Sequence, residues 1–191
     1  PSFEDPETGF VLSESHAIMC YLCNKYNWSD FYPADLEDRA KVDSYLHLHH
    51  RNVREASIGL VAPKVRKDLN FSEDFLATSR SNIEKAFKAI EYGWLNDSRF
   101  LVGDSMTIAD ISAYVEIGQL QDIFTNVYNF ESFPNIQKWL NEMRNVDCHD
   151  VIHVALYELG DISAEAPTME KIINANKKAF QVIQEKLNQI K

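Results

Sequence analysis

Apolar and polar positions follow two different periods along the chain, a short extended one at the start and a helical one afterwards. Two extended segments, Ser2 to Glu4 and Phe10 to Leu12, flank the sequence DPETG, whose proline and glycine favour a turn. We therefore predict a β-hairpin. Ser13 can then cap a helix that runs to about Tyr26, because apolar residues recur at helical spacing: Ala17, Ile18, Tyr21 and Leu22.

The segment NWSDFYPADLED interrupts this periodicity with serine, aspartate and proline. We interpret residues 27–34 as a linker between a domain of residues 1–26 and a domain of residues 35–191. The linker also gathers aromatic side chains, which we expect to hold the two domains together: Trp28, Phe31 and Tyr32.

Beyond the linker the pattern is helical throughout. A long helix is predicted from Asp35 past Ser57, with a bend or an end before Pro63. Further apolar stripes predict four more helices: Leu76 to Trp94, Ile136 to Met143, Val151 to Leu156 ended by Gly160, and Met169 to Leu187, with Pro134 and Pro167 in first turns. The predicted fold is mostly α, a β-hairpin plus helix followed by an all-helical bundle.

The sequence GDSMTIADISAY contains a capping box. Thr107 can accept a hydrogen bond from the backbone at Asp110, Asp110 can return one, and Met106 and Ile111 can close over the pair. Such a box contributes about 0.5 to 2 kcal/mol and by itself predicts only that a helix starts there.

Composition narrows the classes of function. The 191 residues include 19 Lys and Arg against 29 Asp and Glu, and the resulting net charge of -10 argues against binding nucleic acid or anionic membranes. No apolar run approaches the roughly 20 residues of a membrane span, and the first residues lack signal-peptide features, so we expect a cytoplasmic protein. Three cysteines do not suggest a disulfide framework. Because the chain starts with Pro1, we interpret it as a fragment.

Three blocks, LSESHAIMCYLCNKY, FYPADLEDRAKVDSYLHLHHRNVR and FLVGDSMTIADISAY, occur in an order that resembles the cytosolic glutathione transferase superfamily, the middle block being most similar to its theta class. The resemblance implies a thioredoxin-like domain that binds glutathione, a helical domain that completes the pocket for a small hydrophobic electrophile, and a homodimer. It also places Pro1 where the family has the cis-proline that begins its third strand. The theta-class catalytic serine lies on the first strand, so we expect truncation and no catalytic residue in this chain.

The triplet SES lies at a predicted helix start, where unpaired N–H groups and the helix dipole favour a carboxylate. Taken alone, the triplet indicates only an N-cap at Ser13, followed by an acidic residue whose charge interacts favourably with the helix dipole. By resemblance, Ser15 and its backbone N–H bind the γ-glutamyl carboxylate of glutathione, Glu14 binds its ammonium, and Pro1 presents adjacent backbone to the cysteinyl part.

The Cys-x-x-Cys of Cys20 and Cys23 lies too deep in the helix for redox chemistry, which needs a thiol at the helix N-terminus, so we expect two small buried side chains. A zinc site that joins them to His47 and His50 is rejected on spacing, and we expect no metal and no cofactor beyond glutathione as co-substrate.

On the helix from Asp35, four polar residues fall within about 60° of one another and border the apolar row of Val42, Leu46 and Val53; they are Asp43, His47, His50 and Arg54. The pattern alone indicates a solvated face. The resemblance places this helix at the substrate pocket. It implies that Arg54 is the main contact to the substrate and that His50 and His47 are weaker candidates.

The resemblance therefore implies conjugation of the glutathione thiol to electrophiles, although the sequence does not identify the electrophile. A non-catalytic assembly module, as in translation factor complexes, is the alternative. The SES triplet favours the enzyme mildly, because an assembly module has no use for a glutathione carboxylate site.

Overall fold

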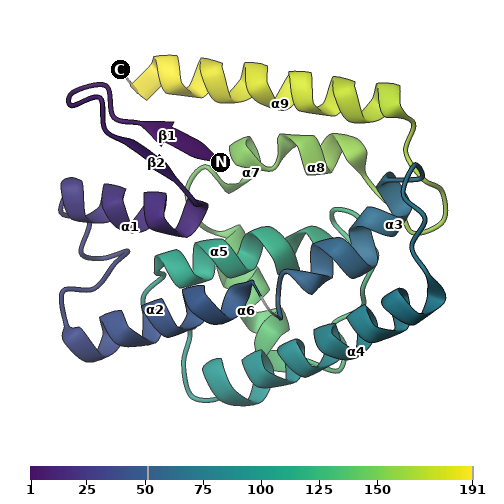
Figure 1. Ribbon diagram of the computed structural model, residues 1–191, viewed down its shortest axis with the longest axis horizontal. Coiled ribbons are helices and arrows are strands. Elements are labelled where there is room, and N and C mark those ends of the chain that lie inside the picture. Colours follow the sequence, from purple (N-terminus) through teal and green to yellow (C-terminus); the bar gives the residue numbers. More distant parts are fainter. Residues whose placement is uncertain (51, 191) are drawn as a thin grey trace.

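The computed structural model describes residues 1–50 and 52–190. A two-stranded hairpin precedes a helical body (Figure 1). The elements are β1 (Ser2–Glu4), β2 (Val11–Ser13), α1 (Ser15–Lys25), α2 (Leu36–His49), the π-helical turn η1 (Ser57–Val61), α3 (Ala62–Val65), α4 (Glu73–Ala89), the π-helical turn η2 (Ile90–Trp94), α5 (Ile108–Ile117), the 3-10 turn η3 (Gly118–Leu120), α6 (Pro134–Arg144), α7 (His149–Ile152), α8 (Val154–Leu159) and α9 (Met169–Ile190). The mostly helical fold is confirmed.

The hairpin is antiparallel and pairs Ser2 with Ser13 and Glu4 with Val11. Ser13 therefore belongs to a strand, and the N-cap of α1 is Glu14, which corrects the predicted cap at Ser13. The turn of the hairpin is fastened to α1 through Asp5, which is fully buried and accepts hydrogen bonds from Tyr21 Oη and Lys25 Nζ, both at 2.5 Å. The strand pair and α1 thus form one small unit.

The helix predicted from Asp35 past Ser57 is shorter than expected. Asp35 caps its start by accepting from the N–H groups of Glu37 and Asp38, but the helix ends at His49. The chain then turns, with the Asn52 side chain accepting from the backbone N–H of Val53, and resumes in η1 and α3. The helix thus ends before Pro63, as predicted, although it already does so at His49, and Pro63 itself lies in the first turn of α3.

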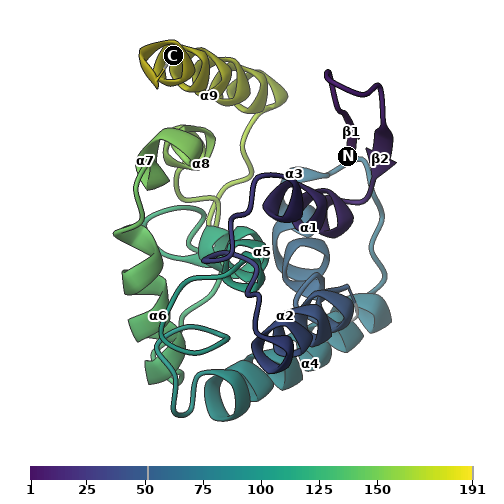
Figure 2. The ribbon, with the colours of Figure 1, turned by 90° about the vertical axis from the view of Figure 1, so that its left-hand side faces the viewer.

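Helix α5 lies at the centre of the helical body (Figure 2). All its residues except Ile111 and Val115 are buried. The predicted capping box begins it, with the Asp110 carboxylate returning a bond to the Thr107 N–H at 2.9 Å. The aromatic core around α5, α4 and α6 includes Trp139 and Phe87, both almost fully buried.

The last three helices depart in detail from the predicted pattern. The stripe from Val151 is divided into α7 and α8, and Gly160 ends α8 with a φ of 64°, as predicted. Pro167 precedes α9 rather than lying in its first turn, and Thr168 caps that helix by accepting from the N–H of Lys171. Helix α9 packs on α8 and α7 through Ala175 and Ala179. No helix among residues 1–50 and 52–190 has both the length and the apolar character needed to cross a bilayer.

Candidate functional site

The three residues predicted to contact glutathione gather where the hairpin meets α1. Ser2 pairs with Ser13 at the end of the hairpin, so Pro1 just before β1 and Glu14 just after β2 flank this pair, and Ser15 begins the helix. All three side chains are exposed. The first N–H groups of α1 have no partner within the helix, which makes this end suitable for a carboxylate.

Glu14 has an unusual backbone. Its φ is 74° and its ψ is 118°, and its side chain makes no capping hydrogen bond. A non-glycine residue in a sparsely populated backbone region costs about 1 to 3 kcal/mol, and such residues cluster at functional sites. Glu14 thus combines a strained backbone with an exposed side chain that does not cap the helix it precedes.

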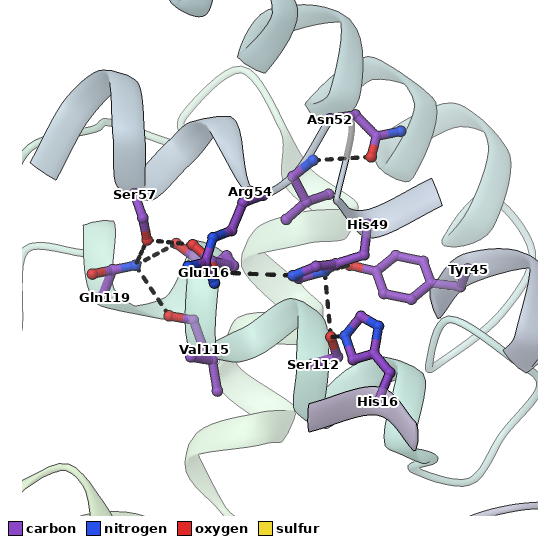
Figure 3. Close-up of polar contacts among 11 residues, drawn as sticks. His16, Tyr45, His49, Asn52, Arg54, Ser57, Ser112, Val115, Glu116 and Gln119 are labelled. Atoms are coloured by element: carbon purple, nitrogen blue, oxygen red, sulfur yellow. Dashed lines mark hydrogen bonds and ion pairs between the residues drawn. The ribbon is translucent and has the colours of Figure 1, made fainter. Parts of the chain in front are cut away.

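The first turn of α1 is tied to the helical body by His16. Its Nε2 lies 2.7 Å from Ser112 Oγ on α5, and the same hydroxyl lies 3.3 Å from Nδ1 of His49 at the end of α2 (Figure 3). The His16 ring also packs on two other imidazoles, with centroids 5.0 Å from His49 and 4.8 Å from His50. Side chains from α1, α2 and α5 therefore meet at the first turn of α1, at the residue after Ser15.

Arg54 belongs to a second polar cluster, which adjoins the cluster of His16, Ser112 and His49 along α5. Its Nη1 donates to Glu116 Oε1 at 2.9 Å, and the same buried carboxylate accepts a hydrogen bond from the Ser57 hydroxyl. Gln119 Nε2 in turn donates to Ser57 Oγ at 2.6 Å. The Arg54 side chain remains 55% exposed, so its guanidinium is held at one end and open to solvent at the other.

The predicted polar stripe is only partly present. His47 and His50 are exposed on α2, but Arg54 follows the end of that helix and reaches Glu116 by a separate route. Asp43 accepts a hydrogen bond from Tyr32 Oη at 2.8 Å, which fastens the linker to α2. Placing Arg54 in line with the histidines on one continuous helix was therefore wrong.

Burial sets the charge state of the two bridged histidines. It lowers the pKa of His49 to about 4, assisted by the nearby His16, His50 and Arg54, and it also lowers the pKa of His16, with His50 the next cause. Both rings are therefore neutral at pH 7. The approach of His49 Nε2 to Glu116 Oε1 at 4.0 Å is accordingly a polar contact and not an ion pair at that pH.

The cysteines of α1 lie in the middle of the helix. Cys23 is buried as predicted, whereas Cys20 is half-buried, and burial raises the pKa of both thiols. In the linker, Tyr32 is buried and Phe31 packs on the core, but Trp28 is 47% exposed and stacks on Tyr26, so it does not hold the domains together as predicted. Within the described part of the chain, no three His, Cys, Asp or Glu side chains are arranged to hold a metal ion.

Several residues of this arrangement were not singled out from the sequence: His16, His49, Ser57, Ser112, Glu116 and Gln119. One signal was available. Ser112 and Glu116 are four residues apart on a helix whose other charged residue, Asp110, belongs to the capping box, and this spacing places two polar side chains on one buried face. A buried polar pair of this kind needs partners, and His49 and Arg54 provide them.

Comparison with known proteins gives a consistent relationship. Residues 53–147 match the family described as "Glutathione S-transferase, C-terminal domain". Glutathione S-transferase theta-1 of Gallus gallus is 33% identical over 136 residues, which are 68% of this chain and 51% of the chicken protein. The chain thus spans about half the length of that relative.

Two solved human structures resemble the fold. The apo form of human glutathione-S-transferase T1-1 has a TM-score of 0.71 at 24% identity, and the match covers 96% of this chain and 77% of that one. A human theta-class glutathione transferase in complex with the glutathione conjugate of 1-menaphthyl sulfate has a TM-score of 0.65 at 25% identity, covering 95% and 78%. The chain belongs to the glutathione transferase superfamily and resembles its theta class.

Proposed function

We propose that this chain forms part of a glutathione transferase that joins the glutathione thiol to small hydrophobic electrophiles. The observation that carries the proposal is the strained, exposed Glu14 beside the unpaired N–H groups that begin α1. An acid next to a positive helix end selects a ligand that carries both a carboxylate and an ammonium, as the γ-glutamyl group does. An N-terminus that only capped a helix would have no need of the strain at Glu14.

Each residue then has a separate role. The N–H group and hydroxyl of Ser15 bind the γ-glutamyl carboxylate, the Glu14 carboxylate binds the ammonium, and the backbone at Pro1 lies along the cysteinyl part. Arg54 and the histidines of α2 contribute to the wall of the electrophile pocket. In this proposal residues 1–26 belong to the glutathione-binding domain and residues 35–191 to the helical domain, in a cytoplasmic homodimer.

The chemistry needs little beyond thiol activation and proximity. A thiol whose pKa is lowered toward neutrality supplies more thiolate, and binding the two reactants side by side converts a bimolecular reaction into a local one. The human theta-class relative holds a glutathione conjugate, which is the product of such a reaction. By the family resemblance, the activating hydroxyl lies on a first strand that has no counterpart among residues 1–50 and 52–190.

Replacing Glu14 with alanine tests the assignment, in calorimetric titrations of glutathione into the full-length gene product. Loss of a charged hydrogen-bond partner should weaken binding by roughly 1.5 to 3 kcal/mol, about 10- to 150-fold. Glu37→Ala is the matched control, because Glu37 is also an exposed acid at a helix start. Equal affinities in the two variants would remove Glu14 from the site, and absence of binding by the unaltered protein would favour the assembly module.

A further inference from the structure

Residues 1–26 are joined to the helical body by one side-chain to side-chain hydrogen bond within the described residues, the bond between His16 and Ser112. His16 also packs on the rings of His49 and His50 and meets the backbone of Leu46 on α2, while Cys23 lies in the core and Met19 and Cys20 pack against it. The polar connection is thus concentrated at the first turn of the helix, next to Ser15.

Three protonatable rings lie at this connection. His16 comes from α1, His49 and His50 come from the end of α2, and the last two have ring centroids 5.7 Å apart. His49 is only 4% exposed, and Tyr45 Oη lies 3.4 Å from its Nδ1. His49 is therefore shielded from water, which can do little to screen a positive charge on it, whereas His16 is half-buried and His50 is exposed.

Ser112 can hydrogen-bond to both rings only while at least one of them is neutral and can accept a proton. A hydroxyl has one proton to donate, so when both rings are neutral one ring accepts that proton and the other donates its own N–H to the oxygen. Double protonation would turn both rings into donors and leave the hydroxyl proton without a ring acceptor. It would also place two positive charges on rings whose centroids are 5.0 Å apart.

Other charged groups act on the same rings. The Leu46 backbone on α2 and Glu14, the N-cap of α1, favour the protonated form of His16, whereas His50 at the end of α2 and His47 on that helix oppose it. On the side of α5, Glu116 faces His49 at 4.0 Å, but Arg54 already pairs with that carboxylate and opposes protonation of His49. The net effect on both rings is a lowered pKa, with burial as its largest cause.

We propose that His16, Ser112 and His49 form a proton-dependent latch, which holds the first turn of α1 against α5 when the rings are neutral and releases it when they take up protons. Ser112 is a positioning residue of this latch. The latch is a property of the fold and does not depend on glutathione. Its consequence for ligand binding, that acidification detaches the Ser15 helix start from the side of the molecule that carries Arg54, rests on the function proposed above.

Hydrogen exchange measured by NMR on the 191-residue chain tests the latch directly. Between pH 7.5 and pH 4, the lower value being near the pKa of His49, amide protection in α1 should fall roughly tenfold relative to the amides of α5, after correction for intrinsic exchange rates. The double variant His16→Gln, His49→Gln keeps polar side chains that do not titrate, so its α1 protection should not change with pH. His153→Gln is the control, since His153 lies between α7 and α8 and packs on His149 and Tyr114, away from the three rings, and it should behave as the unaltered chain does.

Ser112 gives an independent readout. Ser112→Ala should lower α1 protection already at pH 7.5, and Ser112→Thr, which restores a hydroxyl, should recover it. If the double histidine variant does not fold, His16→Gln alone must abolish the pH dependence. The proposal is overturned if α1 protection follows pH equally in the glutamine variants, or if Ser112→Ala leaves α1 as protected as before. These outcomes do not require glutathione, so they are distinct from a failure of the Glu14 assignment.

Discussion

Replacing Asp110 with alanine tests how far one buried carboxylate stabilises the helical body. Asp110 is fully buried and accepts four hydrogen bonds. They come from the backbone N–H of Leu101 at 2.8 Å, the N–H and hydroxyl of Thr107 at 2.9 and 3.0 Å, and the indole Nε1 of Trp139 at 3.0 Å. The residue thus joins the loop before α5, the cap of α5 and helix α6.

The magnitude follows from the donors that the substitution would leave without a partner. Three buried N–H groups lose their acceptor, at about 1 to 3 kcal/mol each, and water entering the vacated space recovers part of that cost. We expect a loss of about 3 to 5 kcal/mol, a large share of the roughly 5 to 15 kcal/mol of a typical domain. Thr107→Ala removes the cap but leaves the carboxylate in place, and should cost only about 1 to 2 kcal/mol.

Urea unfolding followed by circular dichroism and tryptophan fluorescence measures both changes. Asp104→Ala serves as a control, because Asp104 is an exposed acid in the same loop and should change stability by no more than about 0.5 kcal/mol. The contrary outcome is that Asp110→Ala lowers the free energy of unfolding no more than Thr107→Ala does. The N–H groups of Leu101 and Trp139 would then not need the carboxylate as an acceptor, and the reasoning from buried donors would fail. If Asp110→Ala does not fold, the Thr107 and Asp104 variants still test the order of effects.

Three further outcomes are expected. The free energy of unfolding should fall by roughly 3 kcal/mol as pH drops from about 6.5 to about 4, because His49 takes up a proton in the unfolded chain but not in the folded one. In urea titrations, His49→Gln should remove most of this pH dependence. Lys25 holds the pKa of Asp5 at about 2, so the stability from Asp5 is present above pH 3.8 and lost toward pH 2; Asp5→Asn should speed hydrogen exchange in the hairpin but not in α5. The 191-residue chain alone should conjugate glutathione to a generic aromatic electrophile no faster than the buffer blank, and a clear rate above it would place thiol activation within these residues.

Local sequence signals predicted the fold well where one short motif determines the structure. The capping box at Thr107, the cap at Asp35 and the terminating Gly160 all have a physical cause within a few residues, and all are confirmed. The cap of α1 was misplaced by one residue, because pairing with Ser2 draws Ser13 into a strand. Whether Ser13 joins the strand or caps the helix depends on a segment about ten residues away. A rule that considers only the residues around a helix start cannot predict this.

The candidate site was less predictable because its members come from separate elements. Extending one helix past Ser57 placed Arg54 in line with His47 and His50, whereas the helix ends at His49 and Arg54 meets Glu116 instead. Periodicity describes which residues share a face of one helix, and it does not say which two faces meet. The bridge from His16 to Ser112 joins residues almost a hundred positions apart, so it required the tertiary structure.

The π-helical turn η1 has a consequence for comparing this chain with its relatives. It closes with a hydrogen bond from the N–H of Ala62 to the carbonyl of Ser57, five residues back instead of four, so the turn holds one residue more than an α-helical turn does. Within it, a Cβ added at Gly59 would lie 2.5 Å from the Cβ of Ser79 on α4, so the extra residue cannot slide to a neighbouring position without a steric clash. An alignment gap of one position is best placed within this turn, and a protein from which one of its residues is deleted should rotate α3 by about 100° relative to α2.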